Sequence, residues 1–453
     1  MKIVIAGAGE VGSHLAKMLC GEANDITVID DSEDRLEALK ETTDVVTVLG
    51  NTASVDILKE AGVPHADLFI AVNPSTSQNV NIVCSLLAKQ LGSKKVTARI
   101  NNEEYLYHEN TLMFKNLGID LMFYPEQIAA REICDLLKRT SSTDSMNFGH
   151  DKLQLSAFRV DEDTDLMDMT IEELSRKVAT TNGSQFRIVA ISRGSETIIP
   201  QHNTKFKFGD MFYVISLKEG QEKLMKFIGK KSIEVENLMI LGGGPIGEMV
   251  AKRASASMHT IKILDKDMER CIVLSEKTPN NVMVVCADGR NSDKLLEENI
   301  RDYGAFVAVT GSSETNILAC VAAKRLGVER VIAEVENMEY IKLAEDMGVD
   351  AVINKKLITA GKIFKFTLSN KVRFIKYMSG TNAEIVEFIV APHSKATSVP
   401  IKDLNFPNDA VVGGIMRGNE GIIPVGDTQI QAFDHVAVFS SPGAVKEVDK
   451  FFK

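Results

Sequence analysis

Residues 2–12 read Lys-Ile-Val-Ile-Ala-Gly-Ala-Gly-Glu-Val-Gly, and this stretch decides the fold. A short apolar run ends at Gly7, and Gly9 and Gly12 follow at the spacing of a strand that turns directly into a helix. In such a turn the first glycine takes a backbone conformation closed to other residues, the second lets a pyrophosphate approach, and the third lets the helix pack on the strand. The stretch therefore predicts a nucleotide-binding turn, with phosphates at the helix N-terminus.

Two further patterns strengthen this prediction. The apolar run 26–29 ends in Asp30, about 20 residues past the glycines, where a carboxylate accepts hydrogen bonds from an adenosine ribose. The whole arrangement then recurs, since residues 237–247 read Asn-Leu-Met-Ile-Leu-Gly-Gly-Gly-Pro-Ile-Gly and the run 261–264 ends in Asp265. We therefore expect two Rossmann-like units, each with its own nucleotide site.

The composition limits the possible functions. The 453 residues carry a formal net charge of -10 and no dense Lys/Arg stripe, which argues against nucleic acid as the main ligand. The histidines and the six cysteines show no metal-ligand spacing, and dispersed cysteines of this kind are typical of buried, reduced thiols. The sequence starts directly in a strand and has no apolar run of the ~18 residues that span a bilayer. We expect a cytoplasmic protein with no metal and no direct membrane insertion.

The chain divides into four units. Short Val/Ile-rich strands alternate with helices up to residue 138, including an expected helix at 104–117, and this alternation predicts a doubly wound parallel sheet. The small polar run 140–145 indicates a linker, and a smaller α+β unit whose first strand begins at Leu153 follows it. The large and small pair then repeats. We expect Rossmann-like units at 1–140 and 233–370, and small α+β units at 141–229 and 371–453.

Two Rossmann-like units, each followed by a small α+β unit, resemble the regulator-of-potassium-conductance (RCK) arrangement. Each small unit carries the same hairpin pattern, with Arg193, Pro200 and Asp210 matched by Arg417, Pro424 and Asp434. The tandem form is similar to the cytosolic nucleotide-binding subunits of Trk-type potassium uptake systems over essentially the whole chain. The resemblance implies a regulator that forms a homotetrameric ring beneath a TrkH-like membrane potassium channel or transporter. Exchange of NAD(H) for ATP/ADP or AMP would change the ring's shape and gate the pore.

The resemblance also implies site residues. In the first unit these are Gly7, Ala8, Gly9, Glu10, Val11 and Gly12 at the pyrophosphate, Asp30 and Asp31 at the ribose, Asn51 and Thr52 beside the adenine, Asn73 and Pro74 in the cleft, and Arg99 facing phosphates. In the second unit they are Gly242, Gly243, Gly244, Pro245, Ile246, Gly247, Asp265, Asp288 and Thr310. No catalytic residue is implied. Acids after the second strand, such as Asp30, favour NAD(H) over NADP(H), because a 2′-phosphate would meet their charge.

The two sites are not equivalent. The first copy has Asn51 where the second has Asp288, and Arg99 is matched by Glu334. A carboxylate near a phosphate costs free energy where a guanidinium would stabilise it. We therefore expect the first site to take the more highly charged or dinucleotide ligand, and the second to be weaker, to select fewer phosphates, or to be vacant.

Three further expectations complete the sequence analysis. The helices at 126–138 and 355–368, which follow the last strands of the two large units, are natural swapping elements. An NAD-dependent dehydrogenase with a duplicated cofactor domain remains an alternative, although the scattered His202 and His393 show no partner spacing for hydride chemistry. A nucleotide-gated ring for a different ion transporter is the other alternative, because function resides in sites and not in folds.

Overall fold

The computed structural model of the chain describes residues 1–20, 24–74, 77–137, 144–148, 152–160, 164–178, 185–194, 196–229, 235–367, 372–377, 384–441 and 444–453. Within these residues the strands form four sheets, two of six strands and two of five. The expected domain boundaries near residues 140, 232 and 370 lie outside the described residues.

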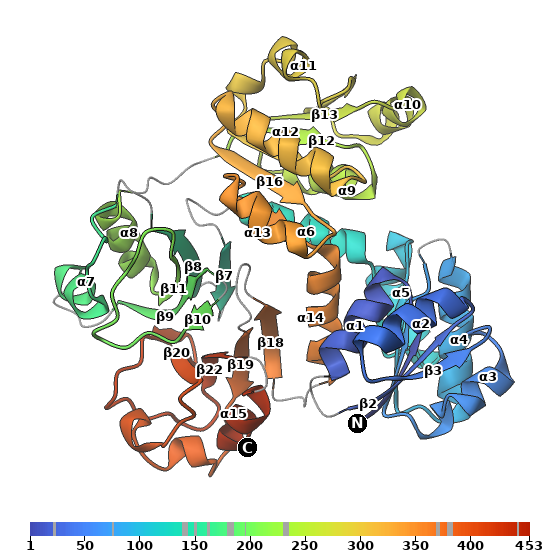
Figure 1. The fold of residues 1–453 in the computed structure, drawn as a ribbon, viewed down its shortest axis with the longest axis horizontal. Helices are drawn as coiled ribbons and strands as arrows, with labels where there is room; N and C mark the ends of the chain where they lie inside the picture. Colours follow the sequence, from blue (N-terminus) through green and yellow to red (C-terminus); the bar gives the residue numbers. More distant parts are fainter. Residues whose placement is uncertain are drawn as a thin grey trace. The chain divides into compact units, whose positions relative to one another are not determined.

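The first large unit is a parallel sheet in the order β3-β2-β1-β4-β5-β6 (Figure 1, blue). Its central strands are almost completely buried, which is typical of a parallel sheet with helices on both faces. Its strands are β1 Lys2–Ala6, β2 Asp25–Asp30, β3 Val46–Leu49, β4 Leu68–Ala71, β5 Lys95–Arg99 and β6 Leu121–Phe123. Its helices are α1 Glu10–Cys20, α2 Glu33–Thr42, α3 Val55–Glu60, η1 Val63–His65, α4 Gln78–Leu91, η3 Glu103–Leu106, α5 His108–Asn116 and α6 Pro125–Leu137.

The second large unit repeats this topology, in the order β14-β13-β12-β15-β16-β17. Its strands are β12 Asn237–Leu241, β13 Thr260–Asp265, β14 Val282–Cys286, β15 Ala305–Ala308, β16 Arg330–Glu334 and β17 Ala351–Ile353. Its helices are α9 Pro245–Ala254, α10 Met268–Lys277, α11 Ser292–Glu297, η4 Ile300–Asp302, α12 Ser313–Arg325, α13 Glu339–Asp346 and α14 Lys355–Thr367. Both copies place the glycine-rich turn after the central strand, where the strand order reverses and open α/β sheets bind ligands.

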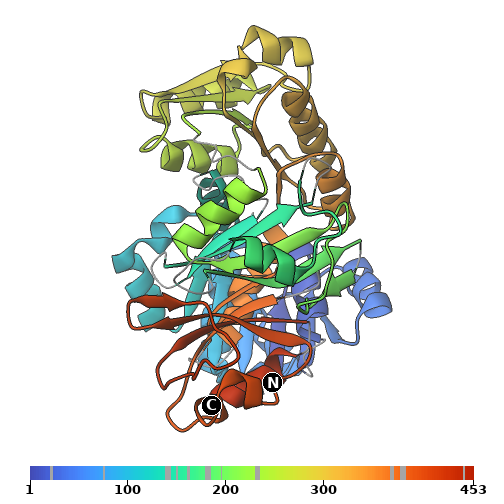
Figure 2. The ribbon, with the colours of Figure 1, turned by 90° about the vertical axis from the view of Figure 1, so that its left-hand side faces the viewer.

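The small units are antiparallel sheets with the orders β10-β9-β11-β8-β7 and β18-β19-β22-β20-β21 (Figure 2, green and red). Their strands are β7 Asp144–Phe148, β8 Leu153–Arg159, β9 Phe186–Arg193, β10 Glu196–Ile198, β11 Met211–Ser216, β18 Val372–Tyr377, β19 Glu384–Ile389, β20 Ala410–Arg417, β21 Glu420–Ile422 and β22 His435–Ser440. Their helices are α7 Ile171–Val178, α8 Lys218–Phe227, η5 Lys395–Thr397, η6 Ile401–Asp403 and α15 Val445–Phe452. Apolar side chains of both sheets form one core, which includes Leu155, Tyr213, Ile385 and Phe439.

Two expectations about local structure were wrong. Asp144 and Ser145, expected in a linker, begin β7, which pairs antiparallel with β8. The helix expected at 104–117 is two elements, η3 and α5, because Tyr107 between them has extended backbone with φ -64 and ψ 145.

The helix α14 follows the second large sheet in sequence but packs against α1 of the first large unit. Lys95 Nζ donates to the carbonyl oxygen of Phe366 at 3.1 Å, and Lys356 Nζ lies 3.2 Å from Glu10 Oε2. The last half of α6, from residue 131, packs with the second large unit, since Cys134 Sγ lies 3.8 Å from the carbonyl oxygen of Val250 in α9. The helices that follow the two large sheets are therefore exchanged within one chain.

The repeated Arg and Asp of the small units form equivalent ion pairs. Arg193 donates from Nε and Nη2 to the two oxygens of Asp210, at 2.8 and 2.7 Å, and Arg417 makes the same two bonds to Asp434. Asp210 also accepts from the backbone N–H of Lys207 at 2.8 Å and is buried. The pattern therefore ties each hairpin to the turn before the next strand.

We expect Asp210→Ala to lower the free energy of unfolding of the first small unit by about 2–4 kcal/mol, because it leaves a charged donor and a backbone donor without their acceptor. Asp427→Ala is the matched control: it removes an exposed ion pair with Lys402, and such a pair contributes about 0–1 kcal/mol. Urea unfolding followed by hydrogen exchange measures both, in β9 to β11 for Asp210→Ala and in β20 to β22 for Asp427→Ala. Equal effects of the two substitutions would contradict this assignment.

Candidate functional site

The first glycine-rich turn runs from the end of β1 to the start of α1. Gly7 has φ +110, a conformation that other residues rarely adopt, and its N–H donates to the carbonyl oxygen of Ile29 at 2.8 Å. A Cβ on Gly12 would lie 1.8 Å from the carbonyl oxygen of Gly7, so α1 packs on the turn only with glycine there. A Cβ on Gly9 would meet nothing within 4 Å. The open space beside Gly9 is therefore not required by the fold and fits the close approach of a pyrophosphate.

The second turn repeats this geometry. Gly242 has φ +111, a Cβ on Gly247 would lie 2.0 Å from the carbonyl oxygen of Gly242, and a Cβ on Gly244 would meet nothing within 4 Å. The one difference is Gly243, which stands where the first copy has Ala8. A Cβ there would lie 2.5 Å from the side chain of Leu274 in α10, the helix that follows β13.

A buried carboxylate holds each turn from the neighbouring strand. Asp30 Oδ2 accepts from the N–H of Ala8 at 2.6 Å, and Oδ1 accepts from the N–H of Ser32 at 2.9 Å. Asp265 makes the same bonds in the second copy, to the N–H groups of Gly243 at 2.7 Å and Asp267 at 2.9 Å. The acid that the sequence predicts for a ribose therefore also sets the shape of the glycine-rich turn.

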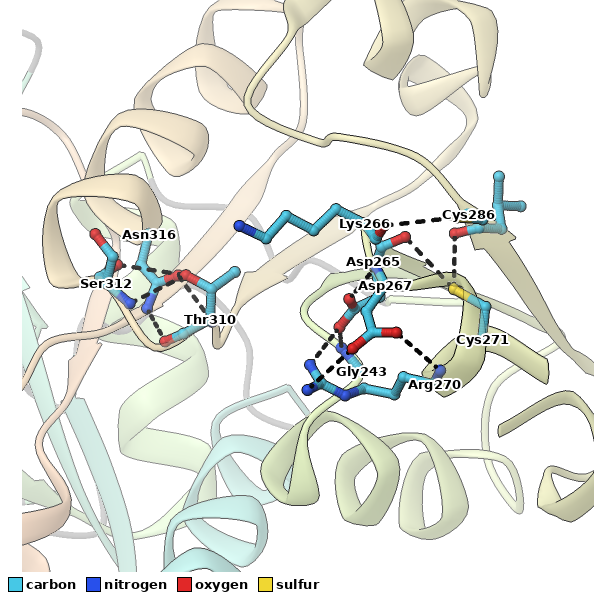
Figure 3. Close-up of polar contacts among 11 residues, drawn as sticks. Gly243, Asp265, Lys266, Asp267, Arg270, Cys271, Cys286, Thr310, Ser312 and Asn316 are labelled. Carbon is cyan, nitrogen blue, oxygen red and sulfur yellow. Dashed lines mark hydrogen bonds and ion pairs between the residues drawn. The ribbon is translucent and has the colours of Figure 1, made fainter. Parts of the chain in front are cut away.

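Arg270 contacts the acid of the second site, since its Nη1 lies 3.2 Å from Asp265 Oδ2 (Figure 3). Arg35 has the matching place in the first site, where its Nη1 lies 3.5 Å from Asp30 Oδ1. Burial alone would raise the pKa of the Asp265 carboxyl. The backbone N–H groups of Asp267 and Gly243 and the Arg270 guanidinium outweigh burial, so the pKa lies below its ordinary value. Asp265 is therefore an ionised hydrogen-bond acceptor at neutral pH.

Asn81, a buried asparagine in α4, connects the loop after β4 to the end of β5. Asn81 Oδ1 accepts from the N–H and the Nδ2 of Asn73, and Asn81 Nδ2 donates to the carbonyl oxygens of Asn73 and Arg99. It thereby joins the ends of β4 and β5. Asn81 and Asn316 were not among the predicted site residues, and their signal in the sequence is that each is a polar residue repeated at one helical position.

Asn316 has the same role in the second copy. Its Oδ1 accepts from the N–H and Oγ1 of Thr310 at 2.9 and 2.7 Å, and its Nδ2 donates to the carbonyl oxygens of Thr310 and Glu334. Thr310 Oγ1 also lies 3.4 Å from the carbonyl oxygen of Ser312. Figure 3 shows this group and the Asp265 group as two separate clusters of polar contacts.

The predicted adenine-side residues lie in loops after the third strands. Thr52 is buried and its Oγ1 lies 3.4 Å from Asn73 Oδ1, whereas Asn51 is exposed and caps the loop through the N–H of Ala53. In the second copy, hydrogen bonds from Arg290 lower the pKa of the half-buried Asp288 carboxyl to about 2. The second copy therefore carries an ion pair in this loop, where the first has an uncharged amide.

Arg99 is held by a carboxylate in this structure. Its Nη2 lies 3.3 Å from Glu126 Oε1, and both side chains are mostly buried. The Nε of Arg99 and the Oε2 of Glu126 are buried and have no hydrogen-bond partner among the described residues. The matching position in the second copy is the buried Glu334, so the sheets differ in charge at this strand end.

The remaining predicted residues fall into two groups. Glu10, Val11 and Gly12 form the first turn of α1, and Pro245, Ile246 and Gly247 form the first turn of α9 after Gly244. The residues Asp31 and Pro74 are exposed, and Lys266 stands in the second copy where Asp31 stands in the first. His202 and His393, considered for hydride chemistry, are exposed and lie outside helices and strands.

No group of three or more His, Cys, Asp or Glu side chains in the described part of the chain is placed to hold a metal ion. No helix among those residues is both long and apolar enough to cross a membrane.

The fold and the two turns define a tandem protein, with a Rossmann-like nucleotide-binding unit and a small antiparallel unit in each half. The TrkA-N domain model matches residues 3–125 and 238–355, and the TrkA-C domain model matches residues 155–229 and 385–453. The chain therefore belongs to the TrkA family.

A curated relative shows the same relationship over the full length. The Trk system potassium uptake protein TrkA homolog of Archaeoglobus fulgidus is 33% identical over 454 residues, which is 100% of both chains. The family is one of regulatory potassium uptake proteins and not of enzymes, so the dehydrogenase alternative is set aside.

Solved structures show the RCK fold. A crystal structure of the GsuK RCK domain has a TM-score of 0.59 and 17% identity, and covers 100% of this chain and 94% of that chain. The GsuK channel bound to NAD has the same score and identity over 100% and 78%. GsuK bound to ADP has a TM-score of 0.51 and 14% identity over 81% and 68%.

The geometry of the turn separates the roles of two glycines. We expect Gly12→Ala to destabilise the first large unit by more than about 3 kcal/mol, because the new methyl group overlaps the backbone. Gly9→Ala should change the stability by less than about 1 kcal/mol, because its methyl group enters open space. Thermal unfolding of the full chain measures both, and a Gly9→Ala variant as unstable as Gly12→Ala would contradict the assignment.

Proposed function

We propose that this chain is the nucleotide-sensing regulatory subunit of a membrane potassium channel or transporter. It binds NAD(H) and adenine nucleotides such as ATP, ADP or AMP at its two glycine-rich turns. The observation that carries the proposal is the duplicated turn, in which open space beside Gly9 and Gly244 adjoins the carboxylates Asp30 and Asp265. The GsuK structures named as bound to NAD and to ADP support these ligand classes.

The residues around each turn have separate tasks in this proposal. The N-termini of α1 and α9 bind the phosphates through free N–H groups. The carboxylates of Asp30 and Asp265 accept further hydrogen bonds from the ribose hydroxyls. Thr52, Asn73 and Pro74 line the first cleft, and Thr310 and Asp288 line the second.

In this proposal, nucleotide binding acts on the transporter through a change of conformation and not through a chemical reaction. A nucleotide shifts a two-state equilibrium only if its affinity differs between the two states. The Lys356–Glu10 ion pair joins α14 to the first helical turn of α1, the place where phosphates bind. A ligand that changes this turn therefore changes the contact of α14, which continues in sequence toward the second small unit at 371–453.

In this proposal four copies of the chain form a homotetrameric ring, which combines the binding free energy of several nucleotide sites. Exposed apolar side chains at equivalent helices, among them Val83 and Leu112 in the first large unit and Leu318 and Leu343 in the second, are a surface for contacts between copies. Several sites in one ring add their binding free energies to one conformational change. We place this ring in the cytoplasm, at the inner face of the membrane, where a TrkH-like subunit holds it.

The charge difference between the two sites predicts different ligands. Displacement of Glu126 by an anionic ligand would leave Arg99 facing that ligand, whereas the second sheet presents Glu334 at the matching position. The second site also has Lys266 where the first has Asp31. We propose that the first site prefers the dinucleotide or the triphosphate, and that the second prefers an adenosine ligand with fewer phosphates.

Single-site variants of the full chain test this difference. Isolated halves are unsuitable, because a cut near residue 230 removes α14 from α1. In Gly244→Ala, where only the first site can bind, we expect NADH and ATP to bind at least about tenfold more tightly than in Gly9→Ala, a difference of about 1.4 kcal/mol. Calorimetric titration measures the affinities, and NADH should remain unoxidised. Tighter ATP binding in Gly9→Ala would contradict the assignment of sites.

Co-purification tests the partner. Isolated from membranes of cells that express it with an affinity tag, the chain should bring down a polytopic potassium transport subunit. The Gly9→Ala, Gly244→Ala double variant should still bind that subunit, and potassium uptake should no longer respond to the NADH/ATP ratio. Capture of a transporter for a different ion would support the other ring alternative. A wild-type uptake response in the double variant would contradict nucleotide control.

A further inference from the structure

Two cysteines lie together at the rim of the second site and are absent from the first. Cys271 is in α10. Cys286 is the last residue of β14 and pairs in register with Asp265, the last residue of β13. The equivalent positions in the first large unit are Leu36 and Leu49, the latter paired with Asp30. The duplicated fold therefore accepts apolar side chains at both positions, and the thiols are specific to the second site.

The two thiols contact the same short stretch of backbone. Cys271 Sγ donates to the carbonyl oxygen of Asp265 at 3.4 Å and lies 3.9 Å from that of Val285. Cys286 Sγ lies 3.7 Å from the carbonyl oxygen of Lys266 (Figure 3). Because they contact consecutive carbonyls at the end of β13, the thiols are neighbours.

The two thiols differ in their exposure to solvent. Cys286 is the one exposed cysteine of the six, all of which lie in the described part of the chain, and Cys271 is buried. The expectation that all the cysteines are buried is therefore wrong for Cys286. Burial, and then the adjacent Cys286 thiol, raise the pKa of Cys271 to about 11. An accessible thiol next to a buried one is the arrangement of an attacking and a resolving cysteine.

We infer that Cys271 and Cys286 form a reversible disulfide that weakens nucleotide binding at the second site. The oxidant is a small-molecule disulfide such as oxidised glutathione. The Cys286 thiolate attacks one of its sulfurs, which forms a mixed disulfide and releases one small thiol. The Cys271 thiolate then attacks Cys286 Sγ and releases the second small thiol, so two protein thiols are oxidised and one small disulfide is reduced.

The effect on the ligand follows from the contacts. Disulfide formation removes both thiol hydrogens and their hydrogen bonds to the carbonyls of Asp265 and Lys266. It also ties α10 to β14 beside Arg270, which precedes Cys271 and bonds the Asp265 carboxylate. The carboxylate that shapes the turn is thereby displaced from its reduced-state position. This part of the inference rests on nucleotide binding at the second site.

The first test is chemical and does not involve nucleotide. The full chain is incubated with oxidised glutathione, and its peptides are mapped by mass spectrometry without reduction. We expect a crosslink between the peptides of Cys271 and Cys286, its loss in Cys286→Ser, and its retention in the control Cys20→Ser. Cys271→Ser should stop at the glutathione adduct on Cys286. Ring closure should accelerate by about tenfold per pH unit between 7 and 9, because the Cys271 thiolate is the minor form.

The second test measures ADP binding to the Gly9→Ala chain, in which only the second site is available. We expect oxidation to raise the Kd for ADP by at least about threefold, and a reducing agent to restore it. In Cys286→Ser on the same background the oxidant should have no effect. A stable glutathione adduct without a crosslink in the wild-type chain, or a crosslink with unchanged ADP affinity, would overturn the inference. No ADP binding in either redox state would instead count against the proposed function, while the crosslink is judged separately.

Discussion

The bond from a buried carboxylate to the backbone N–H of the glycine-rich turn is the interaction on which both halves depend. In each copy it joins the end of one strand to the loop after the neighbouring strand, at 2.6 Å for Asp30 and 2.7 Å for Asp265. A buried charge is tolerated only when hydrogen bonds compensate its lost hydration. The backbone N–H groups of Ala8 and Ser32, and of Gly243 and Asp267, provide that compensation. The turn and the acid therefore keep their shape together before any ligand arrives.

Much of this could be predicted from the sequence, because the relevant signals are local. The strand-to-helix turn expected at residues 2–12 depends on apolar periodicity and glycine spacing, and the structure has α1 at Glu10–Cys20. β7 could not be predicted in this way. It is an edge strand of sequence Asp-Ser-Met-Asn-Phe, and one paired side leaves little need for an apolar pattern. β7 is formed by backbone pairing with β8, and a short polar sequence does not indicate which strand it will pair with.

The polar networks of the sites show the same limit. Asn81 and Asn316 are recognisable as a repeated pair, but their role comes from carbonyls of two strands that only the folded sheet brings together. Arg99 is a comparable case. Its position at a strand end is a sequence property, whereas its contact with Glu126 depends on where α6 begins. The sequence can therefore name the residue types at a site, and the tertiary structure decides their partners.

Duplication allows two sites of one fold to diverge without loss of the fold. The carboxylate, the first and third glycines and the buried asparagine are retained in both halves because each is needed to form the turn or join the strand ends. The positions that differ, Asp31 against Lys266 and Arg99 against Glu334, are not required for that geometry. Residues that a turn needs for folding cannot distinguish ligands, since they are the same in both copies. Under the proposed function, ligand preference therefore comes from the charges around the two turns, and a difference in those charges would let one chain compare two nucleotides.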